Sequence, residues 1–166
     1  AADEAVALAR TLDSTDLLAE ALLGRLMATW GPESLLTRGP VLEELVTLRE
    51  GVTDPELGLL ILEWQVIDRF DHGDLASVES LVEMFSSEAA QTPTVSVRRR
   101  EVLWRGCLAM LDGHIDEAVH INQEAISASA DLAGSPYSFQ NVAITVAIER
   151  FLRRRLDAAI DSIRSI

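Results

Sequence analysis

The stretch from Glu101 to Ile126, EVLWRGCLAMLDGHIDEAVHINQEAI, decides the fold. Its apolar residues recur with the spacing of an amphipathic α-helix on both sides of the sequence Asp112-Gly113-His114. Small residues stand where one helix must approach the next closely: Gly106, Ala109, Gly113, Ala118 and Ala125. The stretch therefore predicts two antiparallel helices joined by a tight turn.

The same pattern recurs along the chain with a period of about 40 residues. Gly73 and Gly113 are 40 residues apart, and so are Trp64 and Trp104. The residues that follow each turn repeat in the same way: Leu35, Leu75, Ile115 and Leu156. A helix pair of this kind buries its apolar face only by stacking on neighbouring pairs. We therefore predict an all-α fold, an α-α superhelix of about four helix pairs that forms one repeat domain over residues 1–166.

Capping signals place the individual helices. Thr15 or Asp16 is the predicted cap of a helix that ends near Trp30, and Asp54-Pro55 and Thr92-Pro93 are the predicted starts of two later helices. The predicted helical segments are 1–12, 15–30, 41–50, 55–71, 75–90, 94–111, 115–131, 137–154 and 156–166. Because the pattern is already under way at residue 1 and still running at residue 166, we expect a fragment of a larger multidomain protein.

Charge and composition limit the partners. Residues 1–91 hold 18 Asp or Glu and 5 Arg, a net charge of −13, whereas residues 92–166 are neutral. An acidic surface repels phosphate backbones, so we expect no direct contact with nucleic acid. The longest apolar run, Leu57–Leu62, is too short to cross a membrane, and no signal peptide is visible. The single cysteine, Cys107, suits a reducing cytoplasm.

The small-residue pattern around Gly113 resembles the skeleton of a tetratricopeptide repeat (TPR), although the period exceeds the roughly 34 residues of that repeat. A closer likeness covers most of the chain. The segments Ala28–Leu35, Trp64–Leu75 and Leu111–Ala118 resemble the long helical-repeat region of actinobacterial STAND-type signalling ATPases, which include LuxR-type transcriptional regulators and some nucleotide cyclases. This resemblance implies a sensor or interaction arm that is attached to a P-loop ATPase and an output domain.

In TPR-like proteins the first helix of each pair lines the concave face. The resemblance therefore implies that four rows of side chains lie there: Glu20, Leu23, Met27 and Trp30; Leu60, Glu63, Ile67 and Phe70; Arg100, Leu103, Cys107 and Met110; and Asn141, Ile144, Ile148 and Phe151. Each row has a polar residue in its first or second position and continues apolar. Two interpretations fit: an open groove for a peptide, a partner helix or a small apolar effector, or ordinary packed core.

No catalytic or metal-binding pattern stands out. The three histidines, His72, His114 and His120, lack a second ligand at metal-binding spacing, and Cys107 has no histidine base nearby in sequence. The sequence contains no phosphate-binding loop and no nucleophile elbow. We therefore expect no enzyme activity, no metal and no cofactor.

The expected function is binding, to a protein partner or to other domains of the same polypeptide. Two alternatives remain open: a structural scaffold that oligomerises, for example as a homodimer, and a small-molecule sensor domain of an ATPase-cyclase.

Overall fold

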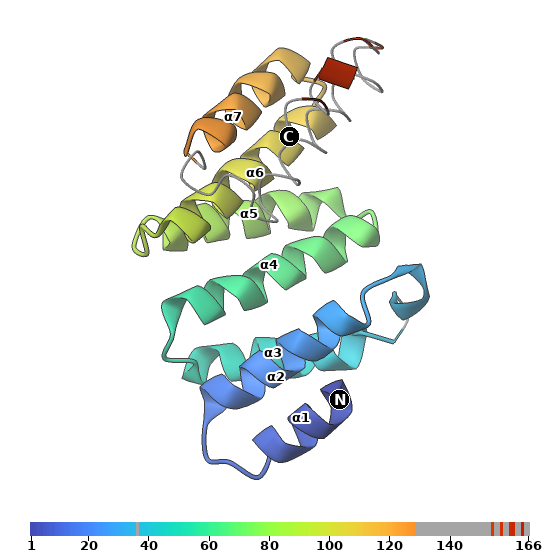
Figure 1. Ribbon diagram of the computed structural model, residues 1–166, viewed down its shortest axis with the longest axis vertical. Coiled ribbons are helices and arrows are strands. Elements are labelled where there is room, and N and C mark those ends of the chain that lie inside the picture. Colours follow the sequence, from blue (N-terminus) through green and yellow to red (C-terminus); the bar gives the residue numbers. More distant parts are fainter. Residues whose placement is uncertain (36, 129–153, 155–156, 158–159, 162–163, 165–166) are drawn as a thin grey trace. The chain divides into compact units, whose positions relative to one another are not determined.

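A computed structural model describes residues 1–35, 37–128, 154, 157, 160–161 and 164 (Figure 1). The helices predicted over 137–154 and 156–166 therefore fall almost wholly outside the described residues. So does the fourth predicted row: Asn141, Ile144, Ile148 and Phe151.

The described residues form helices and no β-strand, which confirms the all-α prediction. The α-helices are α1 (Ala2–Ala9), α2 (Thr15–Ala28), α3 (Gly39–Leu48), α4 (Pro55–Asp71), α5 (Leu75–Ala89), α6 (Val95–Leu111) and α7 (Ile115–Ala128). Two short 3-10 helices, Pro32–Ser34 and Arg49–Gly51, precede and follow α3. The chain divides into two compact units, Ala1–Thr92 and Pro93–Ile166, and each is described by itself.

In the first unit, consecutive helices pack on one another from α1 to α5, and α2 also contacts α4. Figure 1 shows α2 lying in front of α3. The helices share a core formed by buried leucines of α2 and α3 and by the buried side of α4, where Ile61 and Trp64 lie. The α2–α4 contact brings the first helices of two successive pairs together, as stacking of repeats requires.

The two predicted tight turns have the same backbone structure. Gly73 and Gly113 lie in the left-handed region, with φ of +74° and +79°. The N–H of Asp74 donates to the carbonyl of Arg69 at 2.9 Å, and that of His114 donates to the carbonyl of Ala109 at 2.8 Å. Each glycine N–H also donates to the carbonyl three residues earlier. This is the Schellman end of a helix, and it confirms that the two turns, 40 residues apart, are equivalent.

Two of the predicted caps were wrong by one or two residues. Ser14, not Thr15 or Asp16, caps α2, because its Oγ accepts from the N–H of Leu17 at 3.3 Å. Thr94, not Thr92, caps α6 in the same way, through the N–H of Val97. The cap at Asp54 is confirmed: its Oδ1 accepts from the N–H of Glu56 at 2.9 Å. Neighbouring Ser and Thr residues give the same capping signal in a sequence. Only the backbone geometry decides which of them caps the helix.

In the second unit, α6 and α7 pack closely through small residues. Gly106, Ala109 and Ala118 are buried, and a Cβ placed on Gly106 would lie 3.4 Å from Cγ2 of Ile121 on α7. The small-residue pattern therefore predicted the helix contact correctly: a Cβ at position 106 would already be in van der Waals contact with Ile121, which leaves no room there for a long side chain.

The glycine of the α4–α5 turn offers a test of this local geometry. We expect Gly73→Ala to destabilise the protein by about 1–2 kcal/mol, because a residue with a Cβ is strained at this φ. Gly58→Ala is the matched control: Gly58 lies inside α4 with nothing near its missing Cβ, so alanine should stabilise by about 0.5–1 kcal/mol. Urea unfolding followed by circular dichroism measures both, and equal effects of the two substitutions would contradict the turn geometry.

Candidate functional site

The predicted rows in the first unit divide into core and surface. Leu23 is buried in the shared core, and Leu60 and Ile67 pack against that core. Glu20 is exposed and Glu63 half-buried. Toward the ends of the two rows, by contrast, three large apolar side chains are exposed: Met27 (66%), Trp30 (59%) and Phe70 (40%). Within this unit, the interpretation as core holds for Leu23, Leu60 and Ile67, and the interpretation as surface holds for the ends of the rows.

The third row, on α6, is half-buried throughout: Arg100, Leu103, Cys107 and Met110. Met110 packs against the core between α6 and α7, and Nη2 of Arg100 donates to Ser96 Oγ at 3.0 Å. Burial raises the pKa of the Cys107 thiol, which lowers the fraction of reactive thiolate at neutral pH. Among the described residues, this row adds no large exposed apolar side chain.

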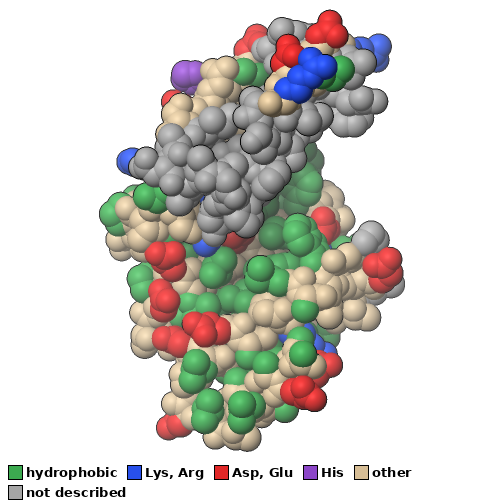
Figure 2. Space-filling view, viewed as in Figure 1, with side chains coloured by type: hydrophobic (Ala, Val, Ile, Leu, Met, Phe, Trp, Pro, Cys, Tyr) green, Lys and Arg blue, Asp and Glu red, His purple; other side chains and the backbone are tan. Residues whose placement is uncertain are grey.

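Trp30 is held at the end of α2 by an aromatic contact. Its ring meets that of Trp64 edge to face, with centroids 5.6 Å apart and planes at 75°. Trp64 is buried in the core whereas Trp30 is largely exposed, so one tryptophan anchors the other. The face seen in Figure 2 shows hydrophobic side chains gathered where α4 lies in Figure 1, with acidic side chains beside them.

A pocket of about 490 Å³ opens beside this tryptophan. We call it the Trp30 pocket, and its described lining residues are Trp30, Gly31, Leu35 and Asp71. The loop that carries Gly31 folds on itself: Ser34 Oγ donates to the carbonyl of Gly31 at 2.9 Å, and the N–H of Ser34 donates to the same oxygen at 3.0 Å. A tryptophan, a glycine-containing turn and a carboxylate thus meet at one concave spot.

A buried ion pair fixes this loop to α4. Arg38 is only 4% exposed. Its Nε donates to Asp68 Oδ1 at 3.0 Å, and its Nη2 lies 2.8 Å from Asp71 Oδ2. Burial by itself lowers the pKa of the guanidinium, but hydrogen bonds and charge interactions with Asp71 and Asp68 outweigh burial and raise the pKa. Sequence reasoning did not single out Arg38, because its partners lie 30 and 33 residues further along the chain.

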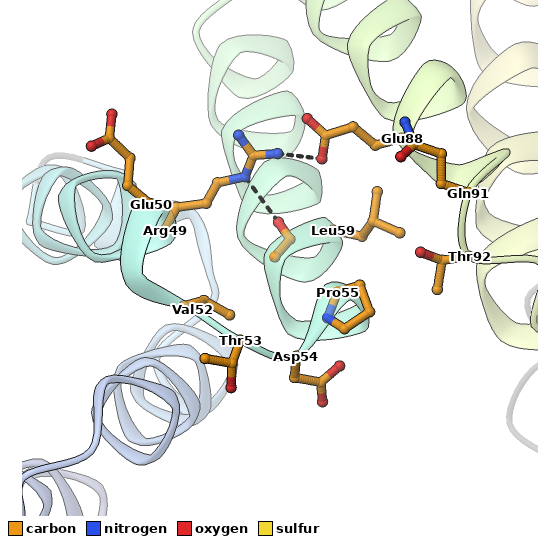
Figure 3. Close-up of a pocket in the computed structure, with 11 residues that line it drawn as sticks. Arg49, Glu50, Val52, Thr53, Asp54, Pro55, Leu59, Glu88, Gln91 and Thr92 are labelled. Carbon is orange, nitrogen blue, oxygen red and sulfur yellow. Dashed lines mark hydrogen bonds and ion pairs between the residues drawn. The ribbon is translucent and has the colours of Figure 1, made fainter.

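A second hollow, of about 540 Å³, lies at the opposite end of α4, around its first turn (Figure 3). Its lining includes Arg49 on one side, Pro55 and Leu59 of α4 at the floor, and Glu88 and Gln91 from the end of α5. Figure 3 shows Arg49 reaching across to Glu88, while the carboxylate of Glu50 points away from the hollow.

Several polar groups of this second hollow are already engaged. Arg49 pairs with Glu88 and donates from Nε to the carbonyl of Gly58 at 3.2 Å. The N–H and the hydroxyl of Thr53 both donate to Asp16, at 2.8 Å for the N–H, and these hydrogen bonds lower the pKa of the Asp16 carboxyl. The hollow is therefore a joint between successive helix pairs, and the Trp30 pocket is the better candidate site.

A third hollow, of about 620 Å³, lies between α3 and α4 and shares Leu35 with the Trp30 pocket. Its polar lining includes His72, whose Nδ1 lies 2.8 Å from the carbonyl oxygen of Asp68. Across the described residues, no three His, Cys, Asp or Glu side chains come together as a metal site would require. No helix in that part of the chain is long and apolar enough to cross a membrane.

Comparison with protein-family models, curated proteins and solved structures yields no match for this chain.

The Arg38 network gives a stability prediction. Replacing Arg38 by Met should destabilise the protein by about 3–5 kcal/mol, because it leaves the carboxylate of Asp68 buried without its partner. The double variant Arg38→Met with Asp68→Leu should recover most of that loss, since it removes both charges. Urea unfolding of the two variants measures the difference. If the double variant were no more stable than the single one, lost packing and not an unpaired charge would be the cause.

Proposed function

We propose that this chain is part of a TPR-like α-solenoid that binds another protein, or another domain of its own polypeptide, and does no catalysis. The observation that carries the proposal is the exposure of Met27, Trp30 and Phe70 on the first helices of two successive pairs. We call these three side chains the apolar surface. Concave faces of helical repeats commonly serve as binding surfaces.

Tryptophan is the residue type most suited to such a role. Interface hot spots are enriched in Trp, whose large rigid ring buries much apolar area at little cost in conformational entropy. Trp30 is also positioned in advance by its contact with Trp64, so binding would not have to order it. An acid, Asp71, lines the pocket beside Trp30, which fits a polar boundary around an apolar centre.

We further propose, from the resemblance of Trp64–Leu75 and Leu111–Ala118, that the binding arm belongs to a cytoplasmic STAND-type transcriptional or signalling regulator. In such a protein a partner on the arm would bias the attached ATPase by binding one of its conformations more tightly.

A pair of methionine variants tests the binding surface. Met27→Ala should weaken binding of the natural partner by about tenfold or more, and so should Trp30→Ala. Truncating a hot-spot residue costs more than about 1–2 kcal/mol of binding free energy. Met84→Ala on α5 is the matched control: Met84 is also an exposed methionine (46%) but lies outside the apolar surface. The partner is isolated by affinity capture and identified by mass spectrometry, and its affinity is then measured by calorimetry. Wild-type affinity of Met27→Ala and Trp30→Ala would refute the proposed surface, provided circular dichroism shows unchanged helicity.

The regulatory setting has a separate test. Sequencing the coding DNA on both sides should reveal a P-loop ATPase in the same reading frame, with a DNA-binding or cyclase module attached. A reading frame without an ATPase would remove the STAND assignment and leave a binding module alone.

A further inference from the structure

The Trp30 pocket combines an exposed aromatic ring with carboxylates. Its described lining contains one acid, Asp71, and no base. A second carboxylate lies close to Gly31 of the lining: Oε2 of Glu33 is 2.8 Å from the point where a Cβ on Gly31 would be. Glycine at position 31 therefore leaves room for the Glu33 carboxylate beside the tryptophan.

The charge of Arg38, which pairs with Asp71 of the pocket lining, is already more than neutralised. Arg38 is buried and is shared between Asp68 and Asp71. One guanidinium thus faces two carboxylates, and Glu33, which is exposed, adds a third negative charge. The side chain of Asp71 is itself 35% exposed, so it still faces solvent while it pairs with Arg38.

The net charge of the surrounding part of the chain is also negative. Residues 1–91 carry a net charge of −13, and clefts on a surface of one sign concentrate ligands of the opposite charge. The face of a tryptophan ring attracts cations most strongly among the aromatic side chains. The tryptophan ring, the nearby carboxylates and the negative net charge therefore all favour a cationic ligand.

We propose that the Trp30 pocket binds a cationic side chain, an arginine or lysine of the partner, while apolar residues flanking it cover Met27 and Phe70. The guanidinium or ammonium group stacks on the Trp30 ring and pairs with Glu33 and Asp71. The partner segment is thus basic and amphipathic. This inference rests on the proposed function and names the class of partner for the same surface.

A peptide pair that differs only in charge tests the inference. One short amphipathic peptide carries arginine between leucines, and the other carries citrulline, the neutral isostere of arginine, at the same positions. Calorimetry at low salt with the full chain should give the arginine peptide about a tenfold advantage. Trp30→Leu should remove that advantage, and Glu33→Gln should reduce it by about threefold. Glu83→Gln, which changes an exposed glutamate on α5, is the matched control and should leave the advantage unchanged.

The outcomes separate this inference from the proposed function. If both peptides bind wild type equally and both lose affinity in Trp30→Leu, the apolar surface binds partners but the cationic pocket is refuted. If the arginine advantage persists in Trp30→Leu and Glu33→Gln, it arises from the general acidic surface, and the pocket is likewise refuted. The absence of binding by either peptide also overturns the inference. The capture experiment with Met27→Ala decides independently whether the surface binds a protein.

Discussion

The buried ion pair of Arg38 with Asp68 and Asp71 is the constraint on which the candidate site depends. The described part of the chain between α2 and α3 contains one short 3-10 helix, and the backbone hydrogen bonds found there are local. Arg38 ties the end of this segment to the last turns of α4, and both carboxylates come from that helix. Buried charges are tolerated only when they are paired, so the position of the loop relative to α4 is fixed within narrow limits. Because Trp30 and Gly31 lie in the same segment, their positions relative to α4 are fixed as well.

The two ends of the α2–α4 contact differ in what their polar groups do. Near the start of α4, side chains satisfy one another: Arg49 with Glu88, and Thr53 with Asp16. That end joins successive helix pairs and leaves little capacity for a ligand. At the other end, an aromatic ring and carboxylates remain open to solvent. Loops at one end of the helices can thus hold helices together while loops at the other end remain available for recognition.

Much of the helical architecture could be predicted from the sequence. The glycine turns at Gly73 and Gly113 were predicted from their spacing, and they adopt the same left-handed geometry because glycine alone has no Cβ to clash there. The cap at Asp54 was also predicted, since a capping side chain followed by proline is a local signal. Ser14 and Thr94 were missed as caps because neighbouring hydroxyl residues offer the same chemistry one or two positions away.

The candidate site was predicted only in part. The resemblance to TPR-like repeats placed Met27, Trp30 and Phe70 in the same rows as Leu23, Leu60 and Ile67, but it does not say how deeply each row is covered by neighbouring helices. The pairing of Arg38 with Asp68 and Asp71 left no sequence signal, because it joins two elements 30 residues apart.

The sequence by itself therefore determined the helices, their turns and the 40-residue period, all of which arise from local backbone preferences and from the periodic placement of apolar residues. Only the tertiary structure decided which apolar residues face solvent and which charges are buried. Exposure depends on contacts between distant segments, and such contacts are set by how the helices pack together.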